Sequence, residues 1–382
     1  MAKVYEFIAN GTEEVEALIP VDVLRRAGVD IVIVSATGDK VVTSAHGVNI
    51  VADALVEDID VSDADLLMIP GGIPGAPNLC AHPIVRDMIQ KQYEAGKLVS
   101  AICAGPMIFG SLGIAKGKRC TCYPGCEGDI AEAEYTAELV TVDGNVITSN
   151  YTGGTMSALH INADGSLSDL FAMYVPEGEG ESHMHCATLS PDGKYLFAND
   201  LGKDAVYRFT TGDSSNPFKD ACTAYQFDRN IHPGPRHMVF SQDGRFAYLL
   251  HELGDMLTVF SYDDGVLEHL STQMAYDGVG HGSADLHFSP DGRFLYTSHR
   301  LKEDGISVFS INIETGEATR AGFCKTGNHP RNFAVSPDGQ YILCACRDSQ
   351  KVEIYKINSE TGMPENTGKS IPVPDPMFVM FR

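Results

Sequence analysis

The sequence predicts two domains of different class: a doubly wound α/β domain with a parallel sheet over residues 1–149, and an all-β propeller over residues 150–382. In the first half, short apolar strands alternate with segments of helical periodicity, which is typical of a parallel sheet covered by helices. The second half repeats a Ser-x-Asp-Gly turn that begins at Ser190, Ser241, Ser289 and Ser336, in steps of 51, 48 and 47 residues. A period of 40–50 residues with Asp-Gly turns indicates propeller blades.

The composition of the chain argues against binding to nucleic acids and to membranes. The 382 residues carry a formal net charge of −23, with 10 Lys and Arg against 21 Asp and Glu over residues 1–149. Binding to a phosphate backbone needs clustered basic residues, so we expect no nucleic-acid partner. No apolar run reaches the 18 residues of a membrane span, and the N-terminus has no signal-peptide pattern, so we expect no membrane partner and a cytoplasmic location.

The cysteines indicate reduced thiols and no metal. Ten cysteines in 382 residues are too few for a disulfide framework. Cys120-Thr121-Cys122 and Cys344-Ala345-Cys346 lack the two-residue gap of zinc ribbons and redox motifs. We therefore expect neither a metal nor a cofactor.

The strands and helices of the first half can be placed in order. Apolar strands are expected at 4–9, 30–35, 65–70 and 98–102, and helices at 13–27 and 84–95, where each helix is followed by a glycine. In such sheets ligands bind at the carboxyl ends of the strands.

Cys103 lies at one of these strand ends. The segment Ser100-Ala101-Ile102-Cys103-Ala104-Gly105-Pro106 passes from an apolar strand through a tight turn toward a helix. Small neighbours allow such a turn and leave the central side chain accessible, as in a nucleophile elbow. A thiol at a helix N-terminus is expected to favour the thiolate. The alternative is a buried, inert cysteine.

Several motifs in order make residues 3–149 resemble the ThiJ/PfpI family, in particular its Parkinsonism-associated protein deglycase group. They are Gly11-Thr12-Glu13-Glu14-Val15-Glu16, the segment 19–28, Pro70-Gly71-Gly72 and Ala101-Ile102-Cys103-Ala104-Gly105-Pro106. The resemblance implies a flavodoxin-like fold, Cys103 as nucleophile and Glu16 as a carboxyl group beside its sulfur. It also implies that the backbone N–H groups of Gly72 and Ala104 face the developing oxyanion.

Two departures from the family pattern matter. Tyr123 occupies a position where many relatives have a histidine, and a tyrosine is a poor base near neutral pH, so we treat it as a substrate-binding residue. The match ends at 146–149, before the C-terminal helix of the relatives. We therefore expect exposed apolar surface and a possible homodimer through the α/β domain.

The second half contains about five blades. Outer strands are expected near Ala158, Val206, Val259, Val308 and Ile354, which with the four turns gives four full blades and a half blade at the front. Residues 376–381 align with 330–335 and are expected to form the first strand of one more blade. We expect this strand to pair with the half blade at 155–162 and close a five-bladed ring. The alternative is an open arc with exposed edges.

Polar residues recur in register at the start of the inner strands. Five residues before each turn serine stand His185, Arg236, Ala284 and Arg331, which should ring the mouth of the channel. His183 alternates with His185 and should point to the same face. Glu252 ends the next strand of its blade. A zinc site from His183, His185 and His287 is an alternative reading.

Residues 150–382 resemble the lactonase-type β-propellers, the family of 6-phosphogluconolactonase and carboxymuconate cyclase. The matching motifs are Asn150-Tyr151-Thr152-Gly153-Gly154, Gly234-Pro235-Arg236-His237, His251-Glu252-Leu253, Ala284-Asp285-Leu286-His287 and Pro330-Arg331. That family is seven-bladed, so this propeller is shortened at its front. Arginines suit an anionic lactone, and histidine or glutamate suits activation of water.

The sequence thus predicts a fusion of a cysteine-dependent glyoxalase or protein deglycase with a lactone hydrolase. The catalytic candidates are Cys103, Glu16, Arg236, His185 and Glu252, and the substrate-binding candidates are Tyr123, His183, His237, His287 and Arg331. The substrates would be a small aldehyde and a sugar lactone. One rival is a redox-sensing or chaperone-like cysteine domain with a non-catalytic propeller scaffold. Another is a chimeric reading frame with a non-functional propeller.

Overall fold

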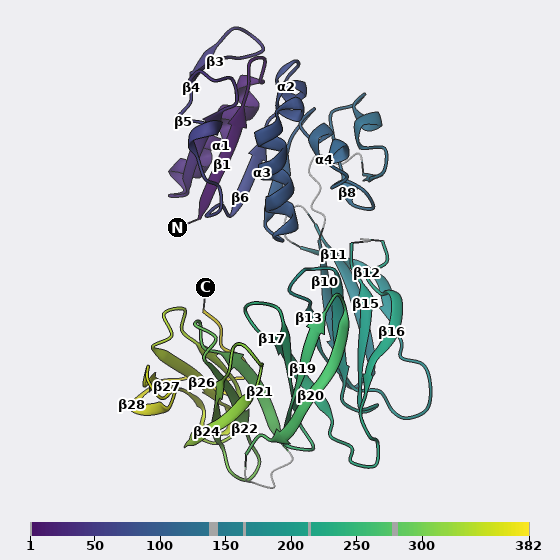
Figure 1. Cartoon of the computed structure of the whole chain (residues 1–382), viewed down its shortest axis with the longest axis vertical. Coiled ribbons are helices and arrows are strands. Elements are labelled where there is room, and N and C mark those ends of the chain that lie inside the picture. Colours follow the sequence, from purple (N-terminus) through teal and green to yellow (C-terminus); the bar gives the residue numbers. More distant parts are fainter. Residues whose placement is uncertain (1, 137–143, 163–165, 213–214, 277–281, 382) are drawn as a thin grey trace. The chain divides into compact units, whose positions relative to one another are not determined.

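The computed structural model describes residues 2–136, 144–162, 166–212, 215–276 and 282–381 (Figure 1). The chain divides into two compact units. Unit 1 comprises Met1–Val146, Leu159–Asp169 and Gly212–Asn216, and unit 2 comprises Ile147–Ala158, Leu170–Thr211 and Pro217–Arg382. Strand β10 (Asn145–Asn150) runs through the expected domain boundary. That boundary, between residues 149 and 150, stays a prediction.

Unit 1 is built on a five-stranded sheet in which every neighbouring pair is parallel. The strand order is β5 (Ala54–Leu55), β2 (Asp30–Ser35), β1 (Lys3–Ile8), β6 (Leu66–Ile69) and β7 (Leu98–Ala101). The helices are α1 (Glu14–Arg26), α2 (Gly75–Ala81), α3 (Pro83–Glu94) and α4 (Met107–Ser111), with 3-10 turns η1 (Val56–Asp58) and η2 (Glu127–Ile130). The four strands and two helices expected from periodicity are all present.

Two apolar layers lie on opposite faces of this sheet. Phe7 packs with Leu79, Val85, Ile89 and Ile108 from the three later helices. On the other face, Val4 and Ile8 pack with α1 and with the hairpin of β3 (Val41–Thr43) and β4 (Asn49–Val51). A short parallel pair, β8 (Arg119–Cys120) and β9 (Glu134–Tyr135), follows the sheet along the chain. These layers hold the carboxyl ends of β1, β6 and β7 in place.

One charged residue is buried in this core without a full set of partners. Glu6 lies on β1 opposite Ile33 and Met68, is 1% exposed, and its Oε2 has no hydrogen-bond partner among the described residues. Burial raises the pKa of Glu6 to about 8. The folded protein therefore holds a proton on Glu6 at pH values where the unfolded chain has lost it.

We expect Glu6 to make unit 1 less stable as the pH rises. The folded pKa lies above the unfolded one, so its contribution is full below pH 4.5 and is lost progressively up to about pH 8. A shift of this size corresponds to roughly 4–5 kcal/mol. Glu6→Gln should flatten this slope in urea unfolding followed by circular dichroism at 222 nm, whereas the exposed-site control Glu94→Gln should keep it. An unchanged slope in Glu6→Gln would contradict the assignment.

Apolar side chains are exposed along one helix of unit 1, α1. Val15, Leu18, Ile19 and Val23 follow helical spacing and are between 39% and 57% exposed. Leu98 at the sheet edge is 68% exposed. Such a stripe is typical of surfaces that contact a partner.

The described residues that follow form five sheets, and in four of them all neighbouring strands are antiparallel. One has three strands, β10, β11 (Thr155–Ile161) and β12 (Leu167–Tyr174). Four have four strands in chain order: β13 (Met184–Leu189), β14 (Tyr195–Asp200), β15 (Ala205–Thr210), β16 (Lys219–Gln226); β17 (Pro235–Phe240), β18 (Phe246–His251), β19 (Met256–Asp263), β20 (Val266–Met274); β21 (Ser283–Phe288), β22 (Phe294–His299), β23 (Gly305–Ile311), β24 (Ala318–Lys325); β25 (Pro330–Val335), β26 (Tyr341–Cys346), β27 (Lys351–Ile357), β28 (Pro364–Pro372). A 3-10 turn, η3 (Arg347–Ser349), links β26 and β27.

The repeated Ser-x-Asp-Gly motif forms the same turn in each four-stranded sheet. Ser190 Oγ donates to Asp192 and accepts from the Tyr195 N–H, which closes the hairpin between the first two strands. The glycine has a positive φ in all four turns, between 68° and 73°. The residue spacing of this motif therefore sets the register of the blades.

The blade predictions need three corrections. The segments near Val206, Val259, Val308 and Ile354 are the third strands, not the outermost, because β16, β20, β24 and β28 pair outside them. The front sheet has three strands rather than half a blade. Residues 376–381 form no strand, and β11 pairs with β10 and β12, so the expected pairing with 155–162 is absent from the described residues.

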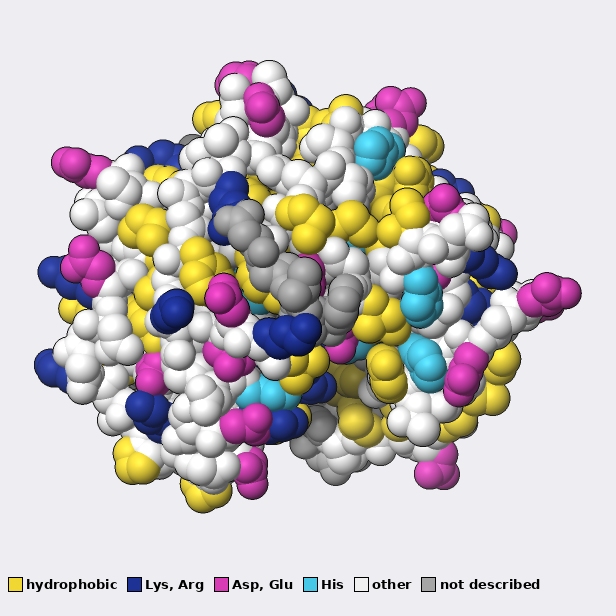
Figure 2. All heavy atoms as spheres, turned by 90° about the horizontal axis from the view of Figure 1, so that it is seen from below, with side chains coloured by type: hydrophobic (Ala, Val, Ile, Leu, Met, Phe, Trp, Pro, Cys, Tyr) yellow, Lys and Arg dark blue, Asp and Glu magenta, His cyan; other side chains and the backbone are white. Residues whose placement is uncertain are grey.

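All ten cysteines are free. No helix within the described ranges is long and apolar enough to cross a bilayer. On the face drawn in Figure 2, acidic and basic side chains are interspersed and several histidines gather on one side.

Candidate functional site

Cys103 lies on a strained turn at the end of β7. Its φ is 60°, a left-handed value that few residues other than glycine adopt. The turn is held by the Ile102 N–H, which donates to the Ile69 carbonyl at 3.1 Å, and by the Gly105 N–H, which donates to the Ile102 carbonyl at 2.8 Å. Strain of this kind gathers at active sites, and the elbow expected from the sequence is present.

Glu16 and Gly71 lie beside this turn. The Gly71 N–H donates to Glu16 Oε2 at 2.9 Å. A Cβ atom added to Gly71 would lie 2.6 Å from both Cys103 Cβ and Glu16 Oε2, so only glycine allows the carboxyl group and the cysteine to approach. The structure thus brings Cys103 and Glu16 together, as the family resemblance implies.

The electrostatics of Cys103 contradict the expectation of a favoured thiolate. Burial, together with the hydrogen bond and negative charge of Glu16, raises the pKa of the Cys103 thiol to about 11. Hydrogen bonds from the backbone N–H groups of Ala104 and Gly72 act in the opposite direction but are outweighed. The helix after the turn begins only at Met107 and has five residues, so its dipole adds little at the sulfur.

Removing the charge of Glu16 should therefore activate the thiol. In Glu16→Gln the side-chain oxygen still accepts from Gly71, but the pKa of Cys103 should fall from about 11 toward its ordinary value of 9.0. We expect Cys103 to react with iodoacetamide about tenfold faster at pH 8, measured by mass spectrometry with the exposed Cys222 as internal control. A slower reaction would mean that Glu16 stabilises the thiolate by donating a proton to it.

Tyr123 approaches Cys103 through its backbone. Its N–H donates to the Cys103 carbonyl at 2.8 Å, and its side chain is 59% exposed. The expected substrate-binding residue therefore borders the turn.

The second group of candidates lies where the inner strands of the blades begin. His185, Arg236, Ala284 and Arg331 are the second residues of β13, β17, β21 and β25, as their common spacing predicts. In each strand the register shifts here, so that these residues are skipped in the pairing with the second strand. Such bulges re-aim side chains and are common beside active sites.

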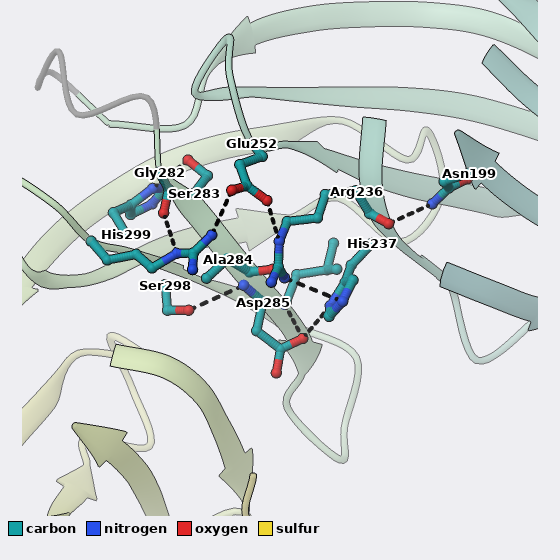
Figure 3. Close-up of polar contacts among 12 residues, drawn as sticks. Asn199, Arg236, His237, Glu252, Gly282, Ser283, Ala284, Asp285, Ser298 and His299 are labelled. Atoms are coloured by element: carbon teal, nitrogen blue, oxygen red, sulfur yellow. Dashed lines mark hydrogen bonds and ion pairs between the residues drawn. The ribbon is translucent and has the colours of Figure 1, made fainter. Parts of the chain in front are cut away.

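Arg236 is fully buried in this group. Its Nε donates to Glu252 Oε2 at 2.7 Å, and its Nη1 contacts His237 Nε2 at 3.2 Å and the Ala284 carbonyl (Figure 3). Burial lowers the pKa of Arg236, and the charge of Glu252 opposes this effect. The guanidinium thus links two neighbouring blades.

Glu252 lies between two arginines. Its second oxygen accepts from Arg300 Nη2 at 2.7 Å, and Arg300 also donates to the Gly282 carbonyl at 3.0 Å. Burial and the charge of Arg236 lower the pKa of Arg300 to about 10. Because both carboxylate oxygens are engaged, Glu252 positions the arginines rather than activating water.

Asp285 connects the histidines. It accepts from His237 Nδ1 at 2.7 Å (Figure 3). It also contacts His287 Nε2 at 3.0 Å and accepts from Asn332 Nδ2 at 2.6 Å. Burial would raise the pKa of Asp285, but the hydrogen bonds to the two histidines hold it well below its ordinary range. This carboxylate fixes the orientation of His237.

His185 is held neutral. Burial first, and then the charges of Arg236, His237 and Arg331, lower the pKa of His185 to about 2. Its Nδ1 is buried and has no hydrogen-bond partner within the described part of the chain. Its ring contacts His237 at a centroid distance of 5.1 Å and Tyr151 at 5.7 Å, both edge-on. His185 is therefore a neutral imidazole beside the arginines.

His183 lies behind Tyr151 instead of joining the central group. The two rings stack at 4.6 Å, and His183 Nδ1 contacts the Tyr151 carbonyl at 3.0 Å. The alternative zinc set of His183, His185 and His287 is not among the groupings close enough for a metal. The grouping found in the described residues is Glu13, Glu14 and His46, in unit 1.

Arg331 carries the free positive charge of the group. Its half-buried guanidinium has no hydrogen bond or ion pair to any described residue. Its charge nevertheless contributes to the lowered pKa values of His185, Arg236 and Arg300. The arrangement therefore favours an anionic ligand beside a neutral histidine.

Sequence reasoning missed Arg300, Asp285, Asn332 and Tyr151. The signal was present in the same register. Arg300 follows Glu252 by 48 residues, and Cys186, His237, Asp285 and Asn332 repeat in steps of 51, 48 and 47. Following the repeat at the position of Glu252 and at the position of His237 would have identified Arg300, Asp285 and Asn332, but not Tyr151.

Comparison with known proteins assigns each half of the chain to a protein family. Residues 132–381 match the family model of the lactonases with a seven-bladed β-propeller, and residues 2–160 match that of the DJ-1/PfpI family. A 6-phosphogluconolactonase of Formosa agariphila is 34% identical over 225 residues, 56% of this chain and 64% of the relative. The Parkinson disease protein 7 homolog of Danio rerio is 37% identical over 150 residues, 38% of this chain and 79% of the relative.

A solved structure supports the propeller assignment. A Bacteroides uniformis protein, a candidate 6-phosphogluconolactonase, is 42% identical, covers 64% of this chain and 72% of its own, and superimposes with a TM-score of 0.60. The chain spans slightly less than two thirds of the length of the Formosa relative.

Proposed function

The chain belongs to the DJ-1/PfpI family through residues 2–160 and to the seven-bladed lactonase family through residues 132–381, and on this basis we propose that it carries two hydrolytic or addition sites. The propeller would open an anionic sugar lactone of the 6-phosphogluconolactone type. The cysteine domain would act on a small reactive aldehyde, as a glyoxalase or protein deglycase.

One observation carries the lactonase proposal: the guanidinium of Arg331 has no protein partner among the described residues, although it faces a group that already holds Arg236 and Arg300. Like charges at this density favour a bound anion. A phosphate or carboxylate on the lactone would supply it, and arginine binds both groups in two-point geometry.

The residues suggest a division of work in lactone opening. His185, neutral and next to the arginines, takes a proton from water as the water oxygen attacks the lactone carbonyl. The arginines stabilise the oxyanion that forms. The ring C–O bond then breaks, and the proton passes to the departing ring oxygen, which leaves a hydroxy acid. Glu252 keeps Arg236 and Arg300 in place throughout.

The substrate itself would strengthen His185 as a base. The charges of Arg236 and Arg331 contribute to its low pKa, so a bound anion that offsets them should raise it. A base with a pKa nearer to the working pH transfers protons more efficiently.

The experiment for this proposal is direct. The purified chain is added to freshly made 6-phosphogluconolactone, and acid release is followed in a pH-stat against spontaneous hydrolysis. We expect acceleration proportional to protein concentration. No acceleration over water, with a folded propeller, would overturn the proposal.

For the cysteine domain, the Cys103 thiol would add to an aldehyde such as methylglyoxal to give a hemithioacetal. The N–H groups of Gly72 and Ala104, whose hydrogen bonds lower the pKa of the Cys103 thiol, support this proposal. Because the thiol is held largely protonated, the reaction should speed up as the pH rises.

We also propose a cellular location and an oligomeric state for the protein. A cytoplasmic location is supported by ten free cysteines. A homodimer through the α/β domain is supported by the exposed stripe on α1.

A further inference from the structure

The three-stranded front sheet corresponds to a blade without its innermost strand. Asn150 and Thr155 end β10 and begin β11 with the same spacing as Asp200 and Ala205 at the β14–β15 turn. Asn150 Nδ2 donates to Thr155 Oγ1 at 3.0 Å across this turn. β10, β11 and β12 are thus second, third and fourth strands, and the side of β10 away from β11 borders no strand among the described residues.

The segment 376–381 corresponds in register to an innermost strand, since it aligns with 330–335. In the complete blades, aspartates at one register position bind the start of the next inner strand: Asp204 accepts from the Gly234 N–H, Asp255 from the Gly282 N–H and Asp304 from the His329 N–H. Gln350 occupies this register position 46 residues after Asp304.

Gln350 binds the C-terminal segment in the same way. It accepts from the Asp375 N–H at 3.1 Å and donates to the Asp375 carboxylate at 2.6 Å. Asn332, on the inner strand of the last complete blade, accepts from the Val379 N–H at 2.7 Å. The segment is therefore held where the inner strand of a further blade begins.

Most of this segment's capacity for pairing is unused. Apart from the Val379 N–H, residues 376–381 make no hydrogen bond to the described residues. Met377, Phe378 and Met380 are 44%, 70% and 65% exposed. Unpaired backbone with exposed apolar side chains is a template for strand addition.

We propose that residues 376–381 of one copy of this chain add to β10 of a second copy and complete its front blade. The register of the complete blades fixes the pairing: Pro330 lies opposite Cys346, Asn332 opposite Ala345 and Phe333 opposite Cys344. By the same offsets, Pro376 lies opposite Asn150, Phe378 opposite Ser149 and Val379 opposite Thr148, with a bulge at Met377. Ser149 Oγ is buried without a partner in the single chain.

A second copy suits this role better than the same chain. The family to which the blades belong is seven-bladed, while the described residues of this chain form five such sheets. Closing a ring of five would change the angle between every pair of neighbouring sheets, and core packing resists such changes. Docking of two copies requires no such change. The contact is head-to-tail, so it joins copies either into closed rings or into longer chains of copies.

The test compares the full chain with a variant that ends at Asp375, in a dilution series analysed by size exclusion with light scattering. The full chain should grow beyond a dimer as concentration rises, and the truncated variant should stay at monomer or at the α1 dimer. The four complete blades remain in both, so equal melting temperatures are expected. A truncated variant with the mass distribution of the full chain would contradict the proposal.

A peptide of residues 376–382 provides a second measurement. It should occupy β10 and shift the full chain to smaller assemblies, whereas a scrambled peptide should not. If the full chain is monomeric at all concentrations and truncation lowers its melting temperature, the segment closes its own ring and the proposal is wrong. The inference does not rest on either proposed activity.

Discussion

Replacing Arg331 with alanine should lower kcat/KM for an anionic lactone by about 100-fold without loss of stability. The reason is that this guanidinium is not bonded to the described protein residues, so its free energy of interaction is available to the substrate. A charge-assisted hydrogen bond contributes about 1.5–3 kcal/mol, which corresponds to this range of rates. Thermal unfolding should change little, because no buried partner is left behind.

The control and the conservative variant sharpen this result. Arg293→Ala removes an arginine that pairs with Asp291 on an exposed turn, and it should leave lactone turnover unchanged. Arg331→Lys keeps the positive charge, so its KM for the lactone should lie between the values of the parent protein and of Arg331→Ala. If Arg331→Ala turned over the lactone like the parent protein, the anion would bind elsewhere and the assignment would fail.

Replacing Cys103 with serine should reduce aldehyde consumption to the level without protein, a loss of roughly 1,000-fold or more. A hydroxyl group is a far weaker nucleophile than a thiol, and the turn offers no base to activate it beyond Glu16. The measurement is the decay of methylglyoxal followed by absorbance with a trapping reagent, over a range of pH.

The pH dependence gives an independent readout. Because burial and Glu16 raise the pKa of the thiol to about 11, the rate of the parent protein should rise through pH 8 to 10. Cys222→Ser, which changes an exposed cysteine of the propeller, should behave like the parent. Undiminished turnover in Cys103→Ser would remove the nucleophile from this site.

Much of the fold follows from sequence periodicity. The spacing of Ser190, Ser241, Ser289 and Ser336 predicted the hairpin turns, because each serine and its aspartate make the same local hydrogen bonds in every blade. The same count predicted that His185, Arg236 and Arg331 begin inner strands. Local interactions determine these features, so a turn recognised in one repeat predicts the same turn in the next repeat.

Features that depend on contacts distant in sequence were harder to predict. The helix α2, which contains a glycine and a proline, has weak periodicity and is held in place by the buried Leu79 and by Asn78, which donates to the Asn10 carbonyl. The state of Cys103 depends on Glu16, 87 positions earlier in the chain, and the short α4 could not offset it.

The propeller site shows the same limit. Glu252 was expected as a possible base, but its partner Arg300 comes from the next blade and occupies the second oxygen. The strand expected at 376–381 failed to form because a strand needs a neighbour, and the described chain offers this segment a single hydrogen bond, from the Val379 N–H to Asn332.

The central claim is that the propeller binds the anionic group of a lactone through its arginines. The most direct measurement is kcat/KM of the purified chain for 6-phosphogluconolactone and for the same lactone without phosphate, in one buffer. We expect a preference of about 100-fold for the phosphorylated lactone, which disappears in Arg331→Ala. Equal values for both lactones, or no turnover of either by a folded protein, would contradict it.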